Sequence, residues 1–189
     1  MINTHNLSKI MQHTNIEIKA RCPEPDRIRA IMQKKNADFK GVDQQVDSYF
    51  KVPEGRLKLR EGNIENSLIF YKRPNEGGPK QAEVYLYHTG SGSGLKVILT
   101  KALGLPVIVK KKREIYFIDN VKFHIDDVEK LGSFIEIEAI DTTGEISTDK
   151  LIEQCQLYME ILGIGKEELI DCSYSDMLIR EGHCSSTGD

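Results

Sequence analysis

The sequence predicts an α+β fold in which eight mostly antiparallel strands form a closed β-barrel, with helices packed on the outside. About eight segments alternate apolar and polar residues at the period of two that is typical of β-strands. Turn-forming residues join most of these segments as hairpins, and a few amphipathic helical segments lie between them. Eight antiparallel strands can close into a barrel whose side chains point alternately inward and outward.

Charge is distributed over these strands in an unusual way. The polar positions of Asn15–Lys19 and Phe134–Glu138 are rich in carboxylates, and those of Leu57–Arg60 are cations. The more continuously apolar positions lie on the other face of each strand, where the apolar stripes of the helices can cover them. The sequence therefore predicts an inverted barrel, with charges inside and aliphatic residues outside.

The first half of the chain predicts one helix among five strands. The strand at Asn15–Lys19 is followed by a helix that begins near Pro25, with a proline and an acidic residue in its first turn. Turn and breaker residues at Val52–Gly55 and Pro74–Pro79 separate the strands that follow. These strands are predicted over Gln45–Lys51, Arg56–Glu61, Ser67–Arg73 and Gln81–His88.

The second half predicts a hairpin, one more strand and two helices. Thr89–Gly94 is expected to be a flexible loop, because it lacks the spacing of a phosphate-binding loop. A helix over Leu95–Leu103 ends at Gly104, and a later helix is capped by Ser147 or Thr148 and ends at Gly163. The strands of this half are predicted over Val107–Ile118, Asn120–Asp126 and Ser133–Ala139. After the last helix we expect a short helical segment at Lys166–Ile170 and a segment at Ser173–Ile179 that packs on the body.

Composition predicts one cytoplasmic domain. The chain has 189 residues, of which 39% are hydrophobic and 29% charged, and its net charge of −3 argues against a nucleic-acid coat. Its four cysteines form no CxxC pair, which is typical of free thiols in a reducing compartment, and no run reaches the roughly 18 apolar residues of a membrane span. We expect a flexible leader at 1–14, one domain at 15–179 and a disordered tail at 180–189.

Cations on several strands predict a clamp for phosphates. Cations held together in a cavity repel one another and lose hydration, and a polyanion relieves both costs. Arginine suits bidentate phosphate contact, and lysine suits contact by a point charge. The expected phosphate-binding residues are Lys19, Lys58, Arg60, Lys72 or Arg73, Lys111 and Arg113.

Carboxylates on the same faces predict a divalent metal. Glu17, Glu136 and Glu138 cannot bind phosphate directly, but they suit Mg²⁺ or Mn²⁺, which bridges to phosphate oxygens. Each charged pair alone is also typical of a solvated strand face, and Lys110–Arg113 alone is typical of a basic surface patch for RNA or anionic lipid. The joint interpretation rests on alternate charges recurring on at least four strands. The same alternation continues through the other inward polar residues, Lys122, His124 and Asp126.

Four motifs resemble the CYTH family, the triphosphate tunnel metalloenzymes, which includes class IV adenylyl cyclases and thiamine triphosphatases. The likeness runs from about Asn15 to Ile179. The motifs are Asn15–Lys19, where the family has Glu-x-Glu-x-Lys, then Gly55–Arg60, Lys111–Tyr116 and His124–Glu136, and they are most similar to the cyclase-type branch. The chain departs from the pattern at Asn15, where the family's first glutamate belongs.

The resemblance implies an eight-stranded tunnel that binds a triphosphate with a divalent metal. Glu17, Glu136 and Glu138 are then the metal ligands, Asp126 is an inward acid near the phosphates, and the segment with Tyr174 and Asp176 closes one mouth. Asn15 can offer a metal a carbonyl oxygen but no charge. The loss of this carboxylate is expected to weaken a second metal site more than the first, and we hypothesise that Glu138 restores the missing charge.

The leading functional prediction is metal-dependent hydrolysis of an inorganic or organic triphosphate such as tripolyphosphate, thiamine triphosphate or a nucleoside triphosphate. Three alternatives stay open. The first is an adenylyl cyclase that makes cyclic AMP and pyrophosphate, with Lys19 as general base if its neighbours are cationic. The second is a polyphosphate- or nucleotide-binding module without turnover, and the third is an RNA-binding domain. We expect a small-molecule triphosphate or nucleotide as partner, no nucleic acid and no membrane, and a homodimer is possible.

Overall fold

The computed structural model describes residues 11–185, which form eight strands, four α-helices and one 3₁₀ helix. The helices are α1 (Pro25–Lys34), α2 (Leu95–Leu103), α3 (Thr148–Leu162), the 3₁₀ helix η1 (Lys166–Glu168) and α4 (Tyr174–Ser185). The strands are β1 (Met11–Arg21), β2 (Asp38–Phe50), β3 (Arg56–Glu61), β4 (Ser67–Lys72), β5 (Lys80–His88), β6 (Val107–Ile118), β7 (Val121–Val128) and β8 (Gly132–Asp141).

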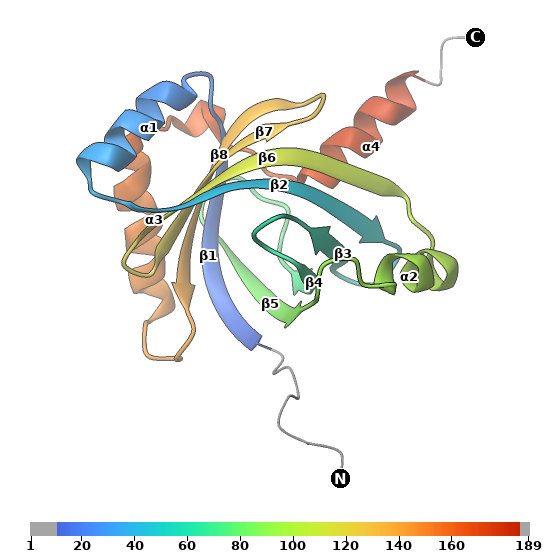
Figure 1. The fold of residues 1–189 in the computed structure, drawn as a ribbon. Helices are drawn as coiled ribbons and strands as arrows, with labels where there is room; N and C mark the ends of the chain where they lie inside the picture. Colours follow the sequence, from blue (N-terminus) through green and yellow to red (C-terminus); the bar gives the residue numbers. More distant parts are fainter. Residues whose placement is uncertain (1–10, 186–189) are drawn as a thin grey trace.

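The strands close into a barrel in the order β1-β5-β4-β3-β2-β6-β7-β8. Every neighbouring pair is antiparallel, including the β1–β8 pair that completes the ring. Figure 1 shows α1 and α3 together on one side of the barrel, with α2 and α4 on the opposite side. The predicted fold class is confirmed.

The main hydrophobic core lies outside the barrel, beneath α1 and α3. Ile18 and Ile137 are register partners on β1 and β8, and they are 1% and 0% exposed. They pack in one cluster with Met32 of α1 and Leu151 of α3. Ser147 caps α3 by accepting a hydrogen bond from the backbone N–H of Lys150. Burial of this face orients the opposite face of each strand, with its charges, into the bore.

A smaller apolar cluster closes one end of the bore. Phe134 lies opposite Asp126 in the β7–β8 ladder, and Val109 lies opposite Asp47 in the β2–β6 ladder, so both point inward. They cluster with Tyr174 at the start of α4, whose ring lies 4.9 Å from that of Phe134. The expectation that the C-terminal segment packs on the body is confirmed.

Several boundaries differ from the predictions. The strand β1 already begins at Met11, so a leader over 1–14 is wrong for residues 11–14, and α4 extends to Ser185, so a tail from 180 is wrong for 180–185. The remaining predicted leader and tail, 1–10 and 186–189, lie outside the described residues. The strand β2 begins at Asp38 and carries a bulge between Phe39 and Gly41. Among the helices that the structure describes, none has the length and apolar character to cross a membrane.

Candidate functional site

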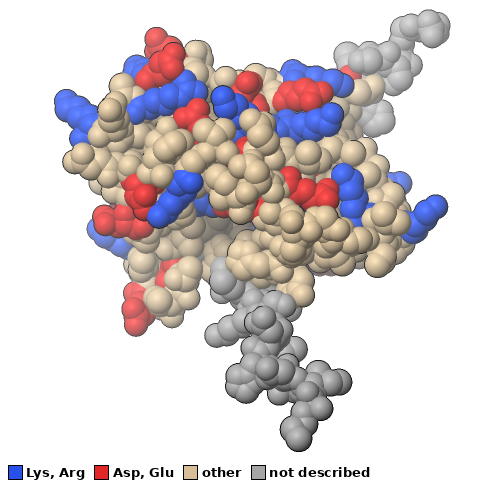
Figure 2. Space-filling model, in the orientation of Figure 1, with Lys and Arg blue, Asp and Glu red and all other residues tan. Residues whose placement is uncertain are grey.

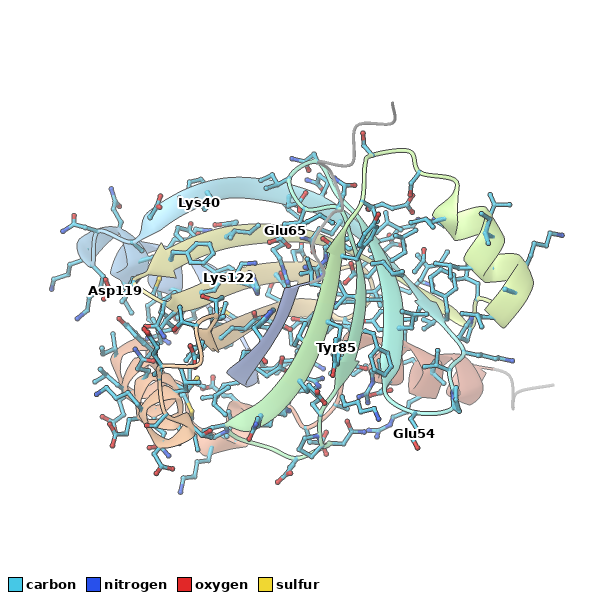
Figure 3. All side chains as sticks on the ribbon, turned by 90° about the horizontal axis from the view of Figure 1, so that it is seen from below. Lys40, Glu54, Glu65, Tyr85, Asp119 and Lys122 are labelled. Atoms are coloured by element: carbon cyan, nitrogen blue, oxygen red, sulfur yellow. The ribbon has the colours of Figure 1, made fainter. Side chains whose placement is uncertain are left out.

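A cavity of about 490 Å³ occupies the bore. In the view of Figure 3, Glu65 and Lys122 lie within the ring of strands, whereas Glu54 lies at its outer edge. Strands β1, β3, β6, β7 and β8, with the residue that follows β4, contribute charged side chains to the cavity wall. These are Glu17, Lys19, Lys58, Arg60, Arg73, Lys111, Arg113, Lys122, Glu136 and Glu138, joined by Glu65 from the β3–β4 loop.

One group of cations surrounds the buried carboxylate of Asp47 on β2. Lys111 Nζ lies 2.8 Å and Lys58 Nζ 3.1 Å from Asp47 Oδ2, and Arg60 donates from Nε and Nη2 to the two carboxylate oxygens at 2.9 and 3.0 Å. Burial alone would raise the pKa of Asp47, but Arg60, Lys111 and Lys58 hold it well below its usual range. The group therefore holds a negative charge beneath three basic side chains that line the cavity.

A second group centres on Arg113 of β6. Its guanidinium binds Asp126 through Nε and Nη2 at 2.7 and 2.5 Å, and Nη2 also reaches Glu136 Oε2 at 2.5 Å. Lys19 Nζ lies 3.0 Å from the other oxygen of Glu136 and 3.8 Å from the ring centroid of Tyr174. Burial alone would raise the pKa of Glu136, but Lys19 and Arg113 hold it well below its usual range. Glu136 is thus ionised and shared between two cations.

The structure separates the two cations at the end of β4. Arg73 lines the cavity with its side chain 3% exposed, where it pairs with Glu17. Lys72 points to the outer surface, is 48% exposed and binds Glu54. Side chains alternate along a strand, so adjacent residues cannot both face the bore. The inclusion of Lys72 in the clamp is therefore corrected, and Arg73 keeps the role.

Alanine substitutions should distinguish these two neighbours. We expect Arg73→Ala to weaken tripolyphosphate binding by about tenfold, because a buried charge-assisted contact is lost. Lys72→Ala should leave binding within about twofold, because an exposed ion pair contributes little. Calorimetric titration of both variants with tripolyphosphate measures the difference, and equal losses in both would contradict the assignment.

Three residues have the geometry of a metal site. Ligand atoms of His124, Glu136 and Glu138 lie within 4.8 Å of one another. His124 Nδ1 lies 3.3 Å from Glu136 Oε2 and 3.6 Å from Glu138 Oε1, so this ring nitrogen faces both carboxylates. Burial, with Arg113 and Lys122 nearby, lowers the pKa of His124, so its imidazole is neutral at pH 7 and can bind a metal. The mixed oxygen and nitrogen donor set fits a divalent cation.

The two remaining predicted polar positions on β1 lie beside this site. Glu17 is the register partner of Glu138, but its carboxylate contacts Arg73, and it is not part of the three-residue cluster. Asn15 is buried in the bore, and its Oδ1 has no hydrogen-bond partner. Glu17 can bind the metal only if its ion pair with Arg73 breaks first.

Two acidic residues of the bore were missed from the sequence. Asp47 lies on a strand where Gln45–Lys51 was predicted, but its neighbours gave no repeated charge that would single it out. Glu65 lies in a loop and binds Lys122 at 2.6 Å and Arg60 at 2.8 Å. Buried Asp43 holds this loop by accepting hydrogen bonds from the N–H groups of Ile64 and Glu65. The period of two applies only to strands, so it could not predict that Glu65, a loop residue, points into the barrel.

The basic quartet Lys110–Arg113 is divided between the two faces of β6. Lys111 and Arg113 line the cavity, whereas Lys110 and Lys112 are exposed, and Lys110 pairs with Glu129. On the face shown in Figure 2, lysines and arginines are interspersed with acidic side chains. This segment therefore does not form the continuous basic patch that an RNA-binding surface requires.

Fold and site together define an enzyme of the triphosphate tunnel type. The model of the CYTH domain matches residues 13–174, and the chain belongs to the CYTH domain family. This family is one of divalent-metal enzymes, in agreement with the cluster around Glu136.

Similar proteins cover nearly the whole domain. A protein of Methanocaldococcus jannaschii named "Putative adenylate cyclase MJ0240" is 27% identical over 86% of this chain and 98% of its own length. PH1012 from Pyrococcus horikoshii OT3 has the same fold, with a TM-score of 0.73 at 23% identity over 86% of this chain and 98% of that chain. HpAC1 from Hippeastrum, described with a dominant triphosphatase activity, has a TM-score of 0.56 at 15% identity over 89% and 96%.

Proposed function

We propose that the protein is a divalent-metal-dependent enzyme that hydrolyses a triphosphate bound along the bore. The observation that carries the proposal is the convergence of cations from β1, β3, β6 and β7, together with Arg73 after β4, on one cavity beside the three candidate metal ligands. Each of these cations already pairs with a carboxylate, which holds it in the cavity wall. An entering polyanion would therefore replace carboxylates as the partner of cations that are already in position.

The phosphate-binding set in this proposal is Lys19, Lys58, Arg60, Arg73, Lys111 and Arg113. When bound by Glu136, Glu138 and His124, with Glu17 in reach, Mg²⁺ or Mn²⁺ neutralises charge that develops on the phosphate oxygens. Arg113 and Lys19 contact Glu136 directly, and they bind phosphate oxygens next to the metal ligands. Lys19 contacts the carboxylate of Glu136, and we assign it to phosphate binding.

A cyclase is the second candidate, and the cavity has room for the organic group that its substrate would carry. One part of the wall is apolar, formed by Ile64, Ile69, Val84, Leu86 and Ile140, and it can hold an organic group attached to the phosphates. The M. jannaschii relative is named as a cyclase, whereas HpAC1 is described with a dominant triphosphatase activity. Hydrolysis remains the lead, because water is always present and cyclisation requires an additional alignment of the ribose hydroxyl.

One assay separates the candidates. The protein is incubated with ATP, tripolyphosphate or thiamine triphosphate, each with Mg²⁺, with Mn²⁺ or with EDTA, and the products are separated by chromatography. Release of inorganic phosphate that requires the metal supports hydrolysis. Cyclic AMP with pyrophosphate as the main products of ATP overturns the lead in favour of the cyclase, and tight binding without any product supports a binding module.

Binding of tripolyphosphate should take up protons. Burial, with Arg113, Arg60 and Lys58 nearby, lowers the pKa of Lys111 to about 7, against the opposing effect of Asp47. At about pH 8 the free lysine is mostly neutral, and a bound phosphate raises its pKa and charges it. The complex then holds more protons than the free protein, so affinity falls as pH rises above about 7. Titration calorimetry in buffers of different ionisation enthalpy measures the uptake.

Lys111→Arg is the matched variant for this measurement. Its guanidinium stays charged throughout this pH range, so the proton uptake due to position 111 should disappear while binding is retained. Unchanged uptake in this variant would assign the proton to another group.

A further inference from the structure

We propose that Asp47 is the positioning residue of the triphosphate clamp, because its carboxylate holds the charged ends of Lys58, Arg60 and Lys111 around one phosphate position. This inference rests on the proposed function. Asp47 touches no part of the cavity wall itself, and its role is to place the groups that do.

The contacts define one carboxylate with three cationic partners. The side chain of Asp47 is 1% exposed, and its two oxygens accept from Arg60 in a fork while Oδ2 also contacts both lysines. A buried carboxylate in this position has the charge and the bidentate geometry that a phosphate offers to the same cations. It therefore maintains the arrangement of the clamp in the absence of a polyanion.

The carboxylate of Asp47 on β2 lies between the cations of β3 and those of β6, and it fixes their positions relative to one another. Asp47 lies opposite Arg60 in the β2–β3 ladder and opposite Val109 in the β2–β6 ladder, two residues from Lys111. Without the carboxylate, the cations of β3 and β6 would repel one another across β2 in a cavity that water screens poorly. Mutual repulsion would turn their flexible side chains apart before a ligand arrives.

Other charged groups also face Lys111, and none replaces Asp47. Arg113 on its own strand and Arg60 and Lys58 on β3 are cationic, and Tyr174 of α4 presents its ring with the centroid 5.7 Å from Lys111 Nζ. Asp126 on β7 is already bound in a fork by Arg113. Asp47 is the carboxylate within hydrogen-bond distance of Lys111 among the described contacts.

The proposal makes a prediction opposite to that of simple charge counting. Removing a negative charge beneath a phosphate site should tighten polyanion binding if only net charge mattered. If Asp47 positions the clamp, Asp47→Asn should instead weaken tripolyphosphate binding by about tenfold or more. Asp47→Glu keeps the charge but moves the carboxylate by one methylene group, and it should also weaken binding, which a purely electrostatic role would not produce.

The experiment is calorimetric titration with inorganic tripolyphosphate in EDTA, with folding of each variant checked by circular dichroism. Glu61→Gln is the control, because Glu61 is an acidic residue of β3 that pairs with Lys96 on the outside of the barrel. A pH series of the same titration gives a second measurement. Asp47→Asn should move the pH at which affinity falls to a lower value in the wild-type background, but not in Lys111→Arg, whose charge does not titrate.

The outcomes distinguish the two proposals. If wild-type protein binds tripolyphosphate neither in EDTA nor with added Mg²⁺, the proposed function fails. If it binds and the Asp47 variants bind equally well or more tightly, the proposed function stands and the positioning role is overturned. If Asp47→Asn does not fold, the comparison of Asp47→Glu with wild type decides: weaker binding supports the role and unchanged binding overturns it.

Discussion

Glu136→Gln is expected to lower metal-dependent triphosphate turnover by about 100-fold or more. Glu136 belongs to the candidate metal cluster with His124 and Glu138 and also contacts Lys19 and Arg113. Glutamine keeps the size of the side chain but removes the charge that a divalent ion requires and that holds the two cations. Initial rates measured over a range of Mg²⁺ and Mn²⁺ concentrations test this, and the variant should need much more metal for half-maximal rate.

The matched control is Glu153→Gln, the same change at an exposed position on α3 where Glu153 pairs with Lys150. Its rate and metal dependence should equal those of the wild type. Metal dependence that is unaltered in Glu136→Gln would contradict the assignment of the metal site to this wall of the bore.

Arg113→Lys is expected to lower turnover by roughly 1,000-fold, although the charge is conserved. Arg113 uses two nitrogens to bind Asp126 and shares one of them with Glu136, while its side chain is 3% exposed. A lysine ammonium cannot make this planar fork, so it cannot hold both carboxylates and also contact a phosphate in the same geometry. Steady-state rates with saturating metal and substrate measure the loss.

Lys112→Arg provides the comparison for this substitution. Lys112 is the residue before Arg113 on β6 and is exposed, so replacing it with another cation should leave turnover within about twofold. A comparable loss at both positions would indicate a general effect on the barrel, and near-normal turnover in Arg113→Lys would remove Arg113 from the catalytic site.

Much of the site was accessible from the sequence because barrel strands have a strict period of two. Once Ile16 and Ile18 are assigned to a covered face, Glu17 and Lys19 must point the other way. The same argument correctly placed Lys58 with Arg60 and Lys111 with Arg113 in the bore. It also explains the one error among the cations, because the period allows only one of Lys72 and Arg73 to face inward.

The chain by itself therefore determined the inverted barrel and the sign of charge at most interior positions, because alternation is a local property of a strand. Tertiary structure decided which charges meet. Asp47 binds cations from β3 and β6, Glu65 enters the bore from a loop, and His124 joins two glutamates of β8. These contacts depend on strand order, register and loop path, and such long-range geometry is set by how the ring closes rather than by any local pattern of residues.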